Sequence, residues 1–273
     1  MSIPAGDPWL SLPEIASMLR AAGCVFAEEE AEVLAAEAPS PGALHAMIGQ
    51  RTAGLPLEHV VGWAEFCGLR LAVSPGVFVP RRRSELLVSR GVELCQRSGP
   101  HAIVVDLACG CGAIGAAIAA RVAGVHLHAC DIDDAAVRCA RRNLRPLGGR
   151  VYVGDLYRPL PARLRGEVAV VAANVPYVPT AEVRLMPAEA RVHEPLIALD
   201  GGKDGLDVLR RAAAGAGGWL APGGYLLIET AVDQAAAASD AFAGAELATE
   251  IAADDDLGAT VIIGKRALTM RHR

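Results

Sequence analysis

The sequence has 273 residues and a formal net charge of −5, with 52% hydrophobic and 21% charged residues. This composition excludes a disordered chain, and the acidic balance provides no electrostatic footprint for bulk nucleic-acid binding. No uninterrupted apolar run reaches the roughly 18 residues that indicate a membrane span.

The cysteines and the N-terminal residues indicate the cellular compartment of the protein. The seven cysteines are an odd number, lie mostly in apolar stretches and lack the paired spacing of a zinc site, so we expect reduced thiols and no bound metal. Residues 1–7 contain no basic segment followed by an apolar one, so no signal peptide is expected. We therefore expect a cytoplasmic protein.

Helical signals dominate the first part of the chain. Apolar residues recur at spacings of three and four, residues 28–37 are rich in Ala and Glu, and a Pro-Ser-Pro-Gly break at 39–42 precedes another helical stretch. We expect a small helical domain over residues 1–62 that docks a substrate. The periodic apolar residues are Leu12, Ile15, Met18, Leu19, Leu44, Met47 and Ile48.

Residues 63–80 have a different pattern. Phe66, Leu69, Leu71 and Val73 alternate loosely, which predicts a β-hairpin linker with its turn at residues 74–76. Ser84 and the residue after it are expected to start a helix.

Residues 81–273 alternate between strand and helix patterns. Strands are expected near 102–107, 126–131, 150–153, 168–173 and 225–230, and helices at 113–122, 134–144 and 204–215. Such alternation predicts an α/β fold with a mostly parallel sheet covered by helices. Two late strands, near 246–252 and 259–265, predict an antiparallel hairpin at the sheet edge. Basic runs at 81–83 and 141–142 are typical of solvated surface.

The stretch from Ile103 to Gly115, IVVDLACGCGAIG, is the first functional motif. An apolar strand, a glycine-rich turn with Gly110 and Gly112, and an alanine-rich helix follow one another. Such turns let backbone N–H groups approach a nucleotide-like cofactor. Asp131 ends the next strand, close to the ~20-residue offset at which an acid binds ribose hydroxyls. NAD and S-adenosylmethionine (SAM) both fit this pattern.

The second motif is Asn174-Val175-Pro176-Tyr177, directly after a buried strand. Pro176 forces the preceding residue to be extended, which leaves the Val175 carbonyl and the Asn174 side chain able to bind an –NH2 group. Tyr177 would add an aromatic wall. A simple turn is the alternative reading of this tetrapeptide alone.

Together these motifs resemble the protein-(glutamine-N5) methyltransferases, the PrmC/HemK family, which modify the Gly-Gly-Gln loop of peptide-chain release factors. The resemblance covers residues 55–265 and rests on Asn-Val-Pro-Tyr, which is similar to the Asn-Pro-Pro-Tyr of SAM-dependent amino-group methyltransferases, and on several ordered matches. These include residues 106–114, Asp131, the Gly154-Asp155 pair, the Glu194-Pro195 pair and residues 227–229.

The resemblance implies a class I SAM-dependent methyltransferase fold with a seven-stranded sheet. It also implies a role for each motif residue. SAM contacts are expected from Ala108, Cys109, Gly110, Cys111, Gly112, Asp131, Ile132, Asp155, Leu156 and Asn174. The acceptor amide is expected to be bound, and catalysis performed, by Asn174, Val175, Pro176 and Tyr177.

Three departures from the family pattern affect the acceptor. One is an N-terminal helical region that is shorter than the family's release-factor-docking domain. Val175 replaces a proline, and residues 80–85 read Pro-Arg-Arg-Arg-Ser-Glu where Pro-Arg-Pro-(Glu/Asp)-Thr-Glu is usual. Other acceptors therefore stay open: another protein, a small-molecule amide or amine, or an exocyclic amine of a nucleic acid. A non-catalytic SAM-binding module is the alternative from another class, and an NAD-dependent dehydrogenase is the least favoured. The preferred expectation is a release-factor protein as partner, with S-adenosyl-L-homocysteine as product and no membrane or nucleic acid.

Overall fold

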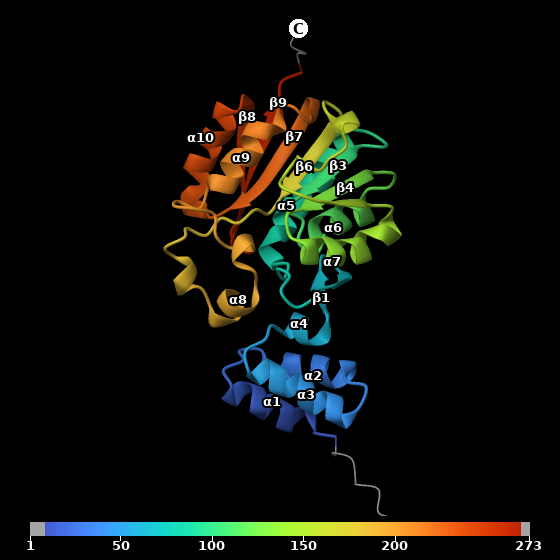
Figure 1. Ribbon diagram of the computed structural model, residues 1–273, viewed down its shortest axis with the longest axis vertical. Helices are drawn as coiled ribbons and strands as arrows, with labels where there is room; N and C mark the ends of the chain where they lie inside the picture. Colours follow the sequence, from blue (N-terminus) through green and yellow to red (C-terminus); the bar gives the residue numbers. More distant parts are fainter. Residues whose placement is uncertain (1–8, 269–273) are drawn as a thin grey trace, which may run out of the picture.

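A computed structural model describes residues 9–268 and shows a helical bundle below a larger α/β part (Figure 1). The bundle consists of α1 (Leu12–Ala21), α2 (Ala27–Glu37), α3 (Pro41–Thr52) and the short α4 (Leu57–Val61). Ser11 and Glu14 form a capping box at the start of α1, and Ser40 caps α3. The bundle has its own core of buried Ile15, Leu19, Leu34, Leu44 and Ile48.

The hairpin that follows consists of β1 (Trp63–Phe66) and β2 (Leu69–Ala72), paired antiparallel. Its turn lies at Cys67 and Gly68, so the assignment of residues 74–76 as the turn of the hairpin is wrong. Both residues have positive φ, 54° and 77°, the backbone that joins two strands through a two-residue turn. Residues 74–76 form a separate turn after the hairpin, which is closed by a hydrogen bond from the Val77 N–H to the Ser74 carbonyl.

Seven strands form one sheet in the order β5-β4-β3-β6-β7-β9-β8. β3, β4, β5, β6 and β7 are parallel to one another, whereas β9 is antiparallel to both β7 and β8. The mostly parallel sheet with an antiparallel C-terminal hairpin is confirmed. The bounds are β3 (Ile103–Leu107), β4 (His126–Asp131), β5 (Arg150–Val153), β6 (Val168–Ala173), β7 (Leu220–Thr230), β8 (Leu247–Asp254) and β9 (Ala259–Arg266).

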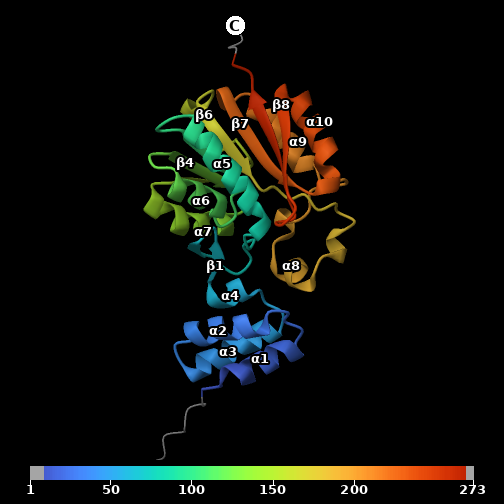
Figure 2. The same ribbon diagram turned by 180° about the vertical axis from the view of Figure 1, so that it is seen from behind.

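Helices cover both faces of this sheet because alternate residues of the central strands are buried on opposite sides. α5 (Glu85–Arg97), α6 (Ala113–Arg121) and α7 (Asp134–Leu144) pack on one face, with Val104 and Val170. α9 (Asp207–Ala216) and α10 (Ala235–Gly244) cover the other face, with Val105 and Val171. Figure 1 shows α9 and α10 in front of the sheet, and Figure 2 shows α5 on the opposite face.

The crossovers reverse direction between β3 and β6, which are neighbours in the sheet but leave toward opposite sides. Ligands of open α/β sheets bind at such a switch point, beyond the carboxyl ends of the strands. The segment with α8 (Ala188–His193) extends from this end of the sheet toward the helical bundle (Figure 1). In the described residues, no helix is both long enough and apolar enough to span a bilayer.

Candidate active site

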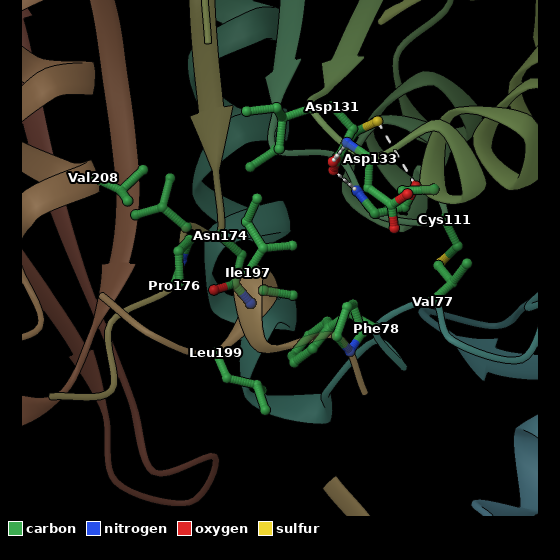
Figure 3. A pocket seen from close by; sticks show the side chains of 18 of the residues that line it. Val77, Phe78, Cys111, Asp131, Asp133, Asn174, Pro176, Ile197, Leu199 and Val208 are labelled. Carbon is green, nitrogen blue, oxygen red and sulfur yellow. Dashed lines mark hydrogen bonds between the residues drawn. The ribbon is translucent and has the colours of Figure 1, made fainter. Parts of the chain in front are cut away.

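A pocket lies at this switch point and is lined by the loops that follow β3, β4, β5 and β6. Figure 3 shows Asp131 and Cys111 on one side of the pocket and Asn174, Pro176 and Val208 on the other. All the residues predicted to bind cofactor or acceptor line the pocket, except Gly112. That residue lies directly behind the wall, as the N-cap of α6.

The turn between β3 and α6 has a backbone that few side chains tolerate. Ala108, Gly110 and Gly112 all have positive φ, and the Gly112 N–H donates to the Cys109 carbonyl. A Cβ on Gly112 would lie 3.0 Å from Leu144, so this turn requires glycine on two counts. For Ala108, φ of 51° is a strained conformation of the kind that clusters at ligand sites.

Asp131 connects this turn to the end of β4. Its Oδ2 accepts from the Gly110 N–H at 2.8 Å and its Oδ1 from the Asp133 N–H at 2.9 Å. Burial raises the pKa of the Asp131 carboxyl, while these two N–H donors oppose the shift. Each oxygen keeps a lone pair for a further donor, such as a ribose hydroxyl.

Asn174 to Tyr177 follow β6 on the opposite side of the pocket. The Asn174 Nδ2 donates to Ser84 Oγ at 3.1 Å, and the Tyr177 hydroxyl donates to Glu229 Oε1 at 3.2 Å. Among the described residues no donor bonds to the Asn174 Oδ1 or to the Val175 carbonyl. Two acceptors are therefore available at the same corner of the pocket.

The buried Glu229, near the end of β7, lies beneath this corner. Its Oε2 accepts from the Ser84 hydroxyl at 2.6 Å, and its Oε1 is 3.2 Å from Arg83 Nε. Burial raises the pKa of Glu229, opposed by the Ser84 hydroxyl and the Arg83 guanidinium. The sequence predicted Ser84 only as the start of a helix and placed Glu229 only within a family match. Their contact was not predicted, because the two residues are 145 positions apart.

The basic run at 81–83 is only partly the solvated surface that its composition predicted: Arg82 is exposed, but Arg81 and Arg83 pair with buried carboxylates. Arg81 Nη2 contacts both oxygens of Glu194, at 2.6 and 2.7 Å, and the guanidinium of Arg83 lies over the Tyr177 ring. The Glu194 side chain is fully buried, which raises its pKa, and the Arg81 charge opposes that shift. These arginines hold the pocket wall, since both pair with buried carboxylates.

The remaining rim of the pocket is apolar and belongs to the segment around α8. Leu185, Leu196 and Ile197 are more than half exposed, and Ile197 lines the pocket. Sequence reasoning did not identify this rim or Phe78, which faces the pocket from the loop after the hairpin (Figure 3). The segment also contacts the helical bundle, because Arg51 Nη1 lies 3.3 Å from Glu189.

Comparison with known proteins identifies the family. Residues 69–202 match the family model described as Methyltransferase small domain. The chain is 33% identical over 227 residues to the release factor glutamine methyltransferase of Geobacter sulfurreducens, covering 82% of this chain and 78% of that protein. It is 34% identical over 216 residues to a 4-amino-L-phenylalanine/4-methylamino-L-phenylalanine methyltransferase of Streptomyces pristinaespiralis. This match covers 78% of this chain and 73% of that protein.

A solved structure agrees on the architecture. A methyltransferase from Pyrococcus furiosus superposes with a TM-score of 0.54 at 16% identity, covering 82% of this chain and 98% of that one, which supports the fold alone. The class I SAM-dependent methyltransferase fold predicted from the motifs is thereby confirmed. The chain is a methyltransferase and belongs to the family of the release factor glutamine methyltransferases.

Proposed function

We propose that the protein transfers a methyl group from SAM to the side-chain amide nitrogen (N5) of a glutamine in a peptide-chain release factor, leaving S-adenosyl-L-homocysteine. The observation that carries this proposal is the pair of available acceptors, Asn174 Oδ1 and the Val175 carbonyl, in one pocket with Asp131 and the glycine turn. A primary amide has two N–H groups, and this corner of the pocket offers two oxygens.

The cofactor half of the pocket fits SAM. The turn from Ala108 to Gly112 would contact its methionine part, and Asp131 its ribose hydroxyls. Ile132, Asp155 and Leu156 would border the adenine. The Asp155 carboxylate pairs with Arg211, which also lines the pocket. When bound, SAM supplies an electrophilic methyl group on its sulfonium sulfur.

The acceptor corner supplies what a poor nucleophile needs. The lone pair of an amide nitrogen is delocalised into its carbonyl. Hydrogen bonds from its N–H groups to Asn174 Oδ1 and the Val175 carbonyl would orient the nitrogen and stabilise the positive charge that develops there. Holding the nitrogen in line with the methyl group contributes a proximity effect, which reaches ~7–11 kcal/mol in ideal intramolecular cases. Tyr177 and Pro176 would pack against the amide.

The helical bundle would dock the protein that carries the glutamine. We propose residues 1–62 as this docking domain, 63–80 as a linker that contains the hairpin, and 81–273 as the methyltransferase domain. Ile197 lines the pocket, and the exposed Leu185 and Leu196 lie on the same segment, which would contact the loop that enters the pocket. This arrangement favours an extended protein loop as the acceptor.

A second candidate acceptor is a small-molecule aromatic amine. The relative from Streptomyces pristinaespiralis is named for an amino acid that carries such an amine, and it is as similar to this chain as the relative from Geobacter sulfurreducens. The same two oxygens would accept hydrogen bonds from an aromatic –NH2 group.

A comparison of methyl-transfer rates decides between the two acceptors. Purified protein is incubated with labelled SAM and either a release factor or 4-amino-L-phenylalanine, and the initial rates are compared. We expect transfer to the release factor, and loss of this transfer in the Asn174→Ala variant while SAM still binds. Faster transfer to the amino acid than to the release factor would refute the proposed acceptor.

A further inference from the structure

We propose that Ser84 and Glu229 are positioning residues that determine which end of the Asn174 side chain faces the acceptor nitrogen. This inference rests on the proposed function, because it assigns Asn174 Oδ1 to the acceptor. It depends on the directions of three hydrogen bonds that join the residue before α5, the end of β7 and the loop after β6.

The direction of each bond follows from the one before it. Ionised Glu229 can only accept, so the Ser84 hydroxyl must donate its one proton to Glu229 Oε2, 2.6 Å away. Ser84 Oγ then has only lone pairs left for Asn174. The Asn174 group that lies 3.1 Å from Ser84 must therefore be the Nδ2 amide, and Oδ1 points away from it as the acceptor for a ligand.

We call the chain of hydrogen bonds from Glu229 through Ser84 to Asn174 the relay. Two further contacts hold the Glu229 carboxylate in place. Glu229 Oε1 accepts from the Tyr177 hydroxyl at 3.2 Å and lies 3.2 Å from Arg83 Nε. With Oε1 engaged by these two donors, Oε2 is left to Ser84. The Glu229 side chain is fully buried and Ser84 is buried too, so water does not compete for these bonds.

The relay predicts that the Glu229→Gln variant reverses it. A glutamine would keep its oxygen toward Arg83 and Tyr177, since both are donors, and would turn its –NH2 group toward Ser84. The Ser84 hydroxyl would then donate to Asn174, whose side chain would rotate and present –NH2 to the acceptor. The –NH2 group of Asn174 would then face an N–H group of the acceptor, which would lose Asn174 Oδ1 as its hydrogen-bond acceptor.

The kinetic test compares variants of the full chain with the release factor as acceptor. We expect Ser84→Ala and Glu229→Gln to lower kcat by at least about 10-fold, as the loss of an aligned active-site hydrogen bond does, with a much smaller change in the dissociation constant of SAM. Ser84→Thr keeps the hydroxyl and should retain most of the activity. Ser98→Ala is the matched control, because its hydroxyl bonds only the Leu94 carbonyl at the far end of α5.

A double-mutant cycle separates positioning from a general structural role. If Glu229 acts through Ser84, then Glu229→Gln causes no further loss of kcat in the Ser84→Ala background, which keeps a measurable rate. Equal losses in both backgrounds would overturn the proposal. So would wild-type kcat in Ser84→Ala or Glu229→Gln. Unfolding curves of each variant identify any that has lost its fold.

A measurement without any acceptor tests the relay independently of the proposed function. The Asn174 side-chain –NH2 signals in a proton–nitrogen NMR spectrum are identified by their absence in Asn174→Asp. We expect Ser84→Ala and Glu229→Gln to shift these signals and Ser98→Ala to leave them in place. Unshifted signals in the first two variants would refute the relay. A wild-type protein that fails to methylate the release factor would count against the proposed function alone.

Discussion

The buried carboxyl of Asp106, in strand β3, should make the stability of the protein depend on pH. Its side chain has no exposed surface, its Oδ2 accepts from the Gly115 N–H at 2.8 Å, and its Oδ1 has no partner among the described residues. Burial raises the pKa of Asp106 to about 8, assisted by the negative charge of Asp131 and opposed by the Gly115 N–H.

The sign of the effect follows from linkage. The folded chain keeps the Asp106 proton up to about pH 8, whereas the unfolded chain loses it near the ordinary value of 3.8. The stabilisation that the protonated Asp106 gives the folded chain is therefore complete below the pKa of the unfolded chain. It is lost as the pH rises through the pKa of the folded chain. A difference of about four pKa units corresponds to about 5 to 6 kcal/mol over the whole window.

The Asp106→Asn variant removes this titration, because an amide keeps an oxygen for the Gly115 N–H and stays neutral at every pH. Urea unfolding of both proteins is measured from about pH 5 to about pH 8. The free energy of unfolding of the wild type should fall relative to that of the variant by about 4 kcal/mol across this range. Parallel profiles would show that Asp106 is ionised in the folded chain and would refute the reasoning.

Three other variants test single contacts. Asp131→Ala should weaken SAM binding by about 10- to 100-fold in calorimetry, since hydrogen bonds to charged groups contribute roughly 1.5–3 kcal/mol; unchanged affinity would exclude the ribose contact. Arg81→Ala leaves the Glu194 carboxylate buried without its cation and should lower the free energy of unfolding by about 3–5 kcal/mol in urea. In Gly115→Ala the new Cβ would lie 2.9 Å from the Asp106 Oδ2, so thermal unfolding should show a loss of about 1–3 kcal/mol. Gly49→Ala, which meets nothing within 4 Å, should show no such loss.

The sheet could be predicted from the sequence because its signals are local. Apolar runs bounded by turn residues located β3, β4, β5 and β6 to within a residue. β7 begins at Leu220, five residues before the predicted start, because the register with β6 shifts between Val168 and Val170 and admits the Pro-Gly-Gly segment into the strand. The α10 helix was not predicted, since its Ala-rich sequence has no apolar periodicity and no side-chain cap.

The pocket could be predicted in part for the same reason. The glycine turn and the tetrapeptide from Asn174 are continuous motifs, and the fold brings both to the carboxyl ends of neighbouring strands. The contact between Ser84 and Glu229 carried no such signal, because a serine before a helix usually serves as its cap and a glutamate late in a strand has no local partner. Their connection exists only once α5 packs beside β7.

The most direct test of the proposed activity is the position of the methyl group on the product. Release factor is incubated with SAM and the wild-type protein or its Asn174→Ala variant, digested, and analysed by tandem mass spectrometry. We expect a gain of one methyl group on the side chain of the glutamine in the Gly-Gly-Gln loop, absent with the variant. An unmodified glutamine with wild-type protein that binds SAM, or equal modification by both proteins, would contradict it.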